Sequence, residues 1–94
     1  MKIVRDHQLS KLFKGGSMFN ATHRGVEMTL AMAKNWVSIY SIESKNQNKG
    51  EAQEAIIFLK KKYSGKEIWG SIPMNPIIKH IFDKLHIKYG APDP

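Results

Sequence analysis

The chain contains no cysteine, so it has no disulfide framework, no thiolate nucleophile and no cysteine-based zinc site. It also lacks an apolar run approaching the roughly 20 residues that a membrane-spanning helix needs. The first residues, MKIVRDHQLSK, lack the apolar core of a signal peptide. We therefore expect a retained N-terminus, no membrane association and a cytoplasmic protein.

Acidic residues are few, since eight Asp and Glu stand against 15 Lys and Arg and leave a net charge of +7. Such a charge attracts anions, including nucleotides, nucleic acids, acidic proteins and phosphorylated cofactors. Solubility explains a basic surface equally well, so the net charge alone does not identify a binding partner. The length of 94 residues and the hydrophobic fraction of 41% fit one folded domain with one modest core.

The first half of the chain has the period of β-strands. Val26, Met28, Leu30 and Met32 alternate with polar or small residues, which is typical of a half-buried strand. Short turns between such segments favour an antiparallel meander. The expected strands are residues 1–4, 18–23, 26–33 and 36–42, with a helical turn at 7–13 and breaks at 15–16, 24–25 and 34–35.

The second half begins with a helical period. Ala52, Ala55, Ile56 and Leu59 stand at i, i+3, i+4 and i+7, which forms one apolar stripe of a helix ending near residues 64–65. The segment EIWGSI, residues 67–72, reads as a strand. Strand, helix and strand in this order predict a βαβ unit whose two strands pair in parallel.

A second helix is expected after this strand. Asn75 can cap its N-terminus and Pro76 suits its first position. The expected buried face of this helix consists of Ile77, Ile78, Ile81, Phe82 and Leu85. A last short strand at 87–89 and a tail at 90–94 complete the chain.

These segments predict a single α+β domain over residues 1–94 with a mixed sheet. Its expected parts are a variable N-terminal segment at 1–16, antiparallel strands at 17–42 and a βαβα half at 43–89. The tail covers 90–94.

The loop QNKGEA, between a strand and a helix, could be a simple turn or an anion site. A helix N-terminus presents unpaired N–H groups and a partial positive charge, and both favour a phosphate. Gly50 would allow close approach and Ala52 would keep the first turn thin, while Lys45 and Lys49 add charge. A glycine before a helix is far more often a turn residue, so the loop needs support from its context.

That context resembles the GNAT family of N-acetyltransferases. Gln47, Gly50 and Ala52 match the family's Q/R-x-x-G-x-G/A signature. The segment SIPMNPIIKHIFDKLHIKY is similar to the family's closing strand, Asn and helix. The resemblance covers roughly residues 17–89 in element order and is at the level of motifs over 36–89.

The resemblance implies a GNAT-like fold, with a meander, a βαβ unit and a C-terminal helix, that binds acetyl-CoA where strands 36–42 and 67–72 part. The backbone of Ser41 and Ile42 would pair with the pantetheine arm, and Asn75 would bind near the thiol. The pyrophosphate would be held by the loop signature that starts at Gln47 and by the amides of Asn48, Lys49, Gly50, Glu51 and Ala52.

The chain departs from the family pattern at two places. The helices that help to form the family's acceptor site shrink here to about HQLSKLFKGG. The family's frequent acid, a Tyr, is replaced by Phe82, so the resemblance implies a gain of rate for Phe82→Tyr. His86 and Ile87 likewise replace the usual Gly-Phe.

Candidate proton-transfer residues remain. Glu43 is near the place where the family often has its base, Glu27 is second, and His80 is a weak acid candidate. For all three, an ordinary solvated side chain is the commoner outcome.

We therefore expect an acetyl-CoA-dependent acetyltransferase whose amine acceptor is a protein, a small molecule or RNA. One alternative is a catalytically weak or inactive GNAT-fold binding module that contacts an acidic protein or RNA. Another is a basic nucleic-acid binder. The size and charge would suit a phage or mobile-element protein, and a homodimer or a host protein partner is possible.

Overall fold

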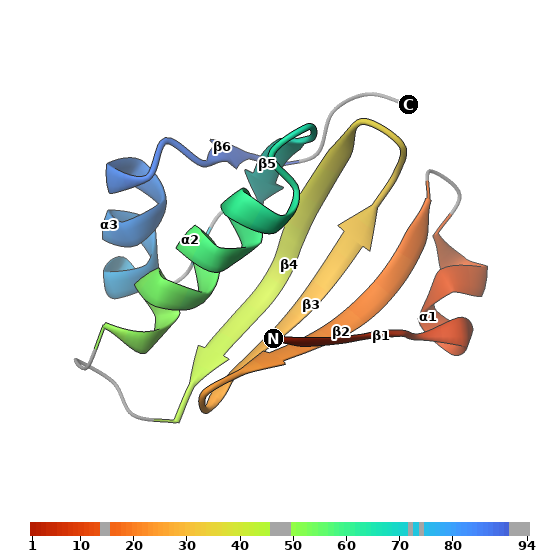
Figure 1. Cartoon of the computed structure of the whole chain (residues 1–94), viewed down its shortest axis with the longest axis horizontal. Coiled ribbons are helices and arrows are strands. Elements are labelled where there is room, and N and C mark those ends of the chain that lie inside the picture. The colour runs from red at the N-terminus through yellow and green to blue at the C-terminus, as the bar shows by residue number, and fades with distance from the viewer. Residues whose placement is uncertain (14–15, 46–49, 72, 74, 91–94) are drawn as a thin grey trace.

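The computed structural model describes residues 1–13, 16–45, 50–71, 73 and 75–90, which form a six-stranded mixed sheet with helices on both faces (Figure 1). The sheet order follows the chain, from β1 to β6. The elements are β1 (Lys2–Arg5), α1 (His7–Leu12), β2 (Ser17–His23), β3 (Val26–Met32), β4 (Trp36–Ser44), α2 (Glu51–Lys62), β5 (Glu67–Gly70), α3 (Pro76–Lys84) and β6 (Lys88–Tyr89).

Strands β1 to β4 pair antiparallel, which confirms the predicted meander. The β2–β3 connection is a two-residue turn in which Arg24 has φ +47° and Gly25 has φ +78°. Positive φ at both positions is the backbone of a type I′ hairpin, whose twist matches that of the strands. The Arg-Gly pair therefore fixes the register that places His23 opposite Val26.

Strands β4, β5 and β6 pair in parallel, so the predicted βαβ unit is confirmed. β4 runs to Ser44, two residues beyond its predicted end. β5 ends at Gly70, so the prediction of a strand over Ser71 is wrong, while Ile72 lies outside the described residues. The Ser71 amide still donates a hydrogen bond of 2.9 Å to the carbonyl of Ile39.

A β-bulge interrupts the pairing of β3 and β4. Thr29 is opposite Ser41 and Leu30 is opposite Ile39, so Tyr40 is the extra residue on β4. A bulge of this kind shifts the alternation of the strand by one position. Ile39 and Ile42 consequently face the main core, whereas Tyr40 contacts Phe13 on the opposite face.

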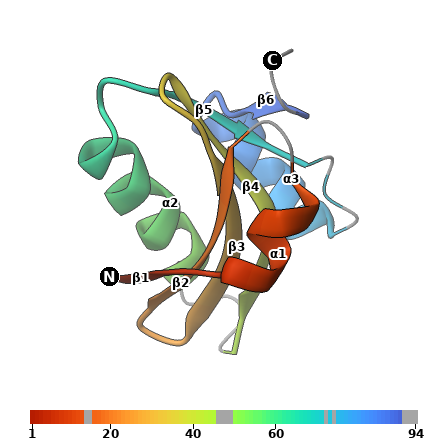
Figure 2. The same ribbon diagram turned by 90° about the vertical axis from the view of Figure 1, so that its right-hand side faces the viewer.

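The main core lies between the sheet and the helices α2 and α3. The predicted stripe of α2, formed by Ala52, Ala55, Ile56 and Leu59, is buried as expected. The opposite face of the sheet carries the short helix α1 and a smaller cluster around Trp36 (Figure 2). We call this second side of the sheet the α1 face.

Helix α3 buries only part of its predicted apolar face. Ile78, Ile81 and Phe82 are buried, and Leu85 packs against the core while remaining partly exposed. Ile77 is 44% exposed, so its predicted burial is wrong. Its place in the first turn of α3 puts it at the rim of a cleft rather than against the sheet.

Candidate functional site

The edge of β4 becomes free where β5 stops. The last hydrogen bond between the two segments joins the Ser71 amide to the carbonyl of Ile39. β4 continues beyond Ile39, and no described residue pairs with its residues 40–43 on the β5 side. Ser41 and Ile42 therefore lie on a stretch of strand edge that could accept an extended ligand, as strand edges do.

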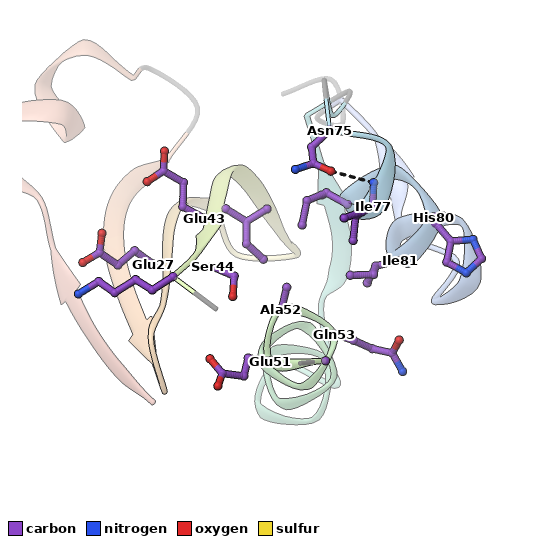
Figure 3. A pocket seen from close by; sticks show the side chains of 14 residues that line it. Glu27, Glu43, Ser44, Glu51, Ala52, Gln53, Asn75, Ile77, His80 and Ile81 are labelled. Atoms are coloured by element: carbon purple, nitrogen blue, oxygen red, sulfur yellow. Dashed lines mark hydrogen bonds between the residues drawn. The ribbon is translucent and has the colours of Figure 1, made fainter. Parts of the chain in front are cut away.

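A cleft of about 690 Å³ opens beside this edge, between the end of β4 and the N-terminal ends of α2 and α3 (Figure 3). We call it the β4 cleft. Its apolar wall comes from Ile42, Ala52, Ile77, Ile78 and Ile81. Polar groups from all three elements stand around this wall, which is the usual make-up of a small-ligand site.

Gly50 shapes one end of the β4 cleft. It is the N-cap of α2, has φ +71° and forms no side-chain cap hydrogen bond. The first helical bond runs from the Glu54 amide to the Gly50 carbonyl, so the amides of Glu51, Ala52 and Gln53 have no partner within the helix. A Cβ built on Gly50 would meet no atom of the described residues within 4 Å, so among these residues nothing crowds the start of α2 at Gly50.

Glu51 places a negative charge at this same helix end. Its Oε2 atom is buried and has no hydrogen-bond partner among the described residues. A Cβ built on Gly25 would lie 3.3 Å from that oxygen, so the carboxylate lies against the β2–β3 turn. Figure 3 shows Glu51 and Gln53 directed to opposite sides of the helix end. The carboxylate interacts favourably with the positive end of the helix dipole. The same charge would repel an anion bound at this helix end.

Three predicted cofactor-binding residues, Gln47, Asn48 and Lys49, lie outside the described residues. Their assignment to a pyrophosphate stays a prediction. The described part of the predicted cradle consists of Gly50, Glu51 and Ala52.

Asn75 caps α3 at the other end of the cleft, as predicted. Its Oδ1 accepts a hydrogen bond of 2.8 Å from the Ile77 amide. This bond fixes the side-chain amide, and Figure 3 shows its nitrogen directed toward the β4 side of the cleft. Asn75 is thus able to donate a hydrogen bond to a ligand that lies along β4.

The two base candidates are direct cross-strand neighbours. Glu27 on β3 pairs in register with Glu43 on β4, and both side chains are exposed. Both residues line the β4 cleft and also a second, polar hollow of about 420 Å³ on the α1 face. Like charges placed opposite each other are unfavourable, so this pair favours a cationic neighbour.

His80 lines the β4 cleft too, on its α3 side. It is exposed on α3, and Figure 3 shows its ring directed outward, on the far side of the cleft from Glu43. The predicted acid and the predicted base thus lie on opposite sides of one cleft, and their roles stay a prediction.

Phe82 occupies the core and not the cleft. Its side chain is 1% exposed and its ring packs against Gly70. Tyr89 is held by a hydrogen bond to Asp83, and this bond raises the pKa of the Tyr89 hydroxyl. Within the described residues, neither aromatic side chain lines the β4 cleft.

The side chains of Thr29 and Ser41 were not predicted to matter. Ser41 was predicted to act through its backbone alone, yet its side chain and that of Thr29 line the polar hollow between the two glutamates and Tyr40. The bulge at Tyr40 brings them there. One extra residue in an apolar strand leaves no distinct trace in composition, so the sequence offers no clear signal for it.

Comparison of the chain with protein-family models, curated proteins and solved structures gives no match. No helix of the described residues has the length and apolar character required to cross a membrane.

Proposed function

We propose that the chain binds acetyl-CoA in the β4 cleft and transfers the acetyl group to an amine, as the GNAT family does. One observation carries the proposal: the free edge of β4 and the glycine-capped N-terminus of α2 meet in the same cleft. A strand edge suits the amides of a pantetheine arm, and a helix N-terminus suits a pyrophosphate.

The described residues fit the cosubstrate at three places. Ser41 and Ile42 would offer their backbone to the arm, and Asn75 would donate to its thiol end. Gly50, with the amides of Glu51 and Ala52, would hold the phosphates. The carboxylate of Glu51 weakens that hold, so the proposal includes a modest affinity for acetyl-CoA.

Bound acetyl-CoA supplies a thioester carbonyl that an amine can attack. The attacking amine must first lose a proton, and Glu43 or a water beside it would accept this proton. The amine nitrogen would then bond to the carbonyl carbon and lose its second proton to solvent, while the C–S bond would break and the thiolate would leave. Solvent protonates that thiolate, because Phe82 supplies no acid.

The missing acid lowers the expected rate. General acid–base assistance is typically worth about 10²–10⁴-fold. A thiol with a pKa near 8.5 is already a moderate leaving group, so the step is slow but allowed. The proposed activity is therefore weak or restricted to few acceptors.

A GNAT-fold binding module without chemistry is the second candidate. The charge of Glu51 at the helix end and the burial of Phe82 both favour it. Its partner would be an acidic protein or RNA, in keeping with the net charge of +7.

Turnover separates the two candidates. Acetyl-CoA consumption should be measured against amines, peptides and RNA for the wild type, Glu43→Gln and the control Glu54→Gln. The enzyme reading predicts turnover that falls only in Glu43→Gln. Tight binding of acetyl-CoA with no turnover on any acceptor would contradict the enzyme hypothesis and favour the binding module.

A further inference from the structure

Two hollows lie side by side on the α1 face. The first is the polar hollow already described, of about 420 Å³. The second is an apolar hollow of about 270 Å³, and its lining consists of Leu9, Leu12, Phe13, Met18, Thr29 and Tyr40. Thr29 lines both, so the two hollows form one continuous surface with a polar and an apolar part.

The described lining of the polar part contains two carboxylates and no cationic side chain, although the protein is basic. Among the described residues, Glu27 and Glu43 form no ion pair, and their side chains stand opposite each other. Lys2 on the edge strand β1 is on the same face by register, opposite Thr22 at the rim of the hollow. Lys45 lines the β4 cleft with both glutamates but does not line this hollow. Two carboxylates with no cationic side chain in the described lining favour a cation as the occupant.

The apolar part is covered incompletely because α1 is a single six-residue helix. Leu12 is 82% exposed, Tyr40 is 45% exposed and Leu9 is 38% exposed. The Phe13 ring supports this surface, with its centroid 6.0 Å from that of Trp36 and 6.1 Å from that of Tyr40. Contiguous exposed apolar side chains beside a polar rim are typical of a protein contact.

We propose that the α1 face docks a segment of another protein that carries a cationic amine next to apolar residues. The amine, from a lysine or an N-terminus, would lie between Glu27 and Glu43, and the apolar residues would lie on Leu12 and Tyr40. The charge selects a cation, and the open, spread-out surface fits a protein segment better than the enclosed pocket that a small molecule needs.

This inference rests on the proposed function and names its acceptor class. Glu27 and Glu43 line both the β4 cleft and the polar hollow, so an amine held there would stand at the mouth of the cleft. The short α1 takes the place of the helices that are missing relative to the family. Its exposed apolar side chains would thus bind the acceptor directly.

Peptide titration without acetyl-CoA tests the docking surface on its own. The probe is a set of short peptides with one lysine and a Leu-Phe pair placed one to four residues from it on either side. Amide shifts in a ¹⁵N-labelled protein should localise to the α1 face, around Thr29, Ser41 and α1. Matched peptides carry acetyl-lysine in place of lysine, or two serines in place of Leu-Phe.

We expect both control peptides to bind at least about threefold more weakly, since an exposed ion pair or a partly buried apolar side chain has an effect of this order. Combined Glu27→Gln and Glu43→Gln should remove the preference for lysine over acetyl-lysine. Leu12→Ser should remove the preference for Leu-Phe. Glu54→Gln and Phe58→Ser, on other surfaces, should change neither preference.

The peptide experiment can fail independently of the proposed function. Equal affinity for the lysine and acetyl-lysine peptides, shifts away from the α1 face, or binding of RNA in place of peptides would overturn the docking surface. Peptide binding with these preferences supports it even if calorimetry finds no affinity for acetyl-CoA, in which case only the proposed function fails.

Discussion

The ring of Phe82 fills the space above Gly70, where a built Cβ would lie 2.4 Å from Phe82 Cε2 and 2.8 Å from Cζ. Gly70 is the last residue of β5, so α3 approaches the sheet closely at the point where β4 and β5 part. This contact holds α3 against the sheet, and other residues of α3, Ile78 and Ile81 among them, line the β4 cleft.

Gly70→Ala should therefore destabilise the protein. The added methyl group would force Phe82 to move in a packed core, and such overpacking typically costs about 1–3 kcal/mol. Urea unfolding measures the change. Gly65→Ala is the control, because a Cβ there meets no atom within 4 Å. Equal free energies of unfolding of the two variants would show that the Phe82 ring can move aside without loss of stability.

Phe82→Tyr should not increase acetyl transfer. The family pattern predicts an acid at this position, but the side chain is 1% exposed and faces Gly70. A hydroxyl added at Cζ would enter the core and lower stability by about 1–3 kcal/mol, through overpacking and the loss of hydration of a polar group. Thermal unfolding and turnover of the variant check this, and a faster enzyme of unchanged stability would contradict it.

His86→Gly should stabilise the protein. His86 follows α3 with φ +58°, and the Ile87 amide donates to the Phe82 carbonyl, which closes the helix in the manner of a Schellman motif. A left-handed conformation costs a non-glycine residue about 1–2 kcal/mol, and part of this gain is lost to the freer unfolded chain. We expect a net gain of about 0.5–1 kcal/mol in chemical unfolding. A loss of stability would mean that the His86 side chain itself contributes.

Asp6 should make the attachment of α1 sensitive to acid. Its Oδ1 accepts from the Leu9 amide and its Oδ2 accepts from Asn20 Nδ2, each at 3.0 Å. The hydrogen bond from Leu9, followed by that from Asn20, lowers the pKa of this carboxyl below its ordinary value of 3.8. Because the folded-state pKa is lowered, the stabilisation is present above pH 3.8 and is lost as the pH falls through the lower, folded-state value.

Carbon-detected NMR titration of Asp6 measures this directly, and a midpoint at or above 3.8 would refute the lowered pKa. Asp6→Asn should keep α1 in place at all pH values, because Asn is an equally good N-cap. In this variant the NMR chemical shifts of Leu9 and Leu12 should no longer change as the pH is lowered.

Much of the fold follows from the sequence because periodicity and turn chemistry act locally. The alternation from Val26 to Met32 and the stripe from Ala52 to Leu59 each predict an element and its buried face. The parallel pairing of β4 and β5 follows from the helix that connects them, because a helical crossover returns the chain to the same end of the sheet.

The site was less predictable because it depends on where elements stop and shift. The bulge at Tyr40 and the early end of β5 at Gly70 result from packing between distant segments. Those two features place Ser41 on the α1 face and free the edge of β4. The burial of Phe82 likewise depends on Gly70, which is twelve residues away along the chain.

Calorimetry with acetyl-CoA tests the central claim most directly. Gly50→Glu adds bulk and negative charge in front of the free amides of α2, and Gly50→Gln adds nearly the same bulk without charge. Gly90→Glu is the control, because Gly90 also has a positive φ and open space around it but lies away from the cleft. We predict that the wild type and Gly90→Glu bind acetyl-CoA, that Gly50→Gln binds it more weakly, and that Gly50→Glu does not bind it. No binding by the wild type, or equal binding by Gly50→Glu, would contradict the account.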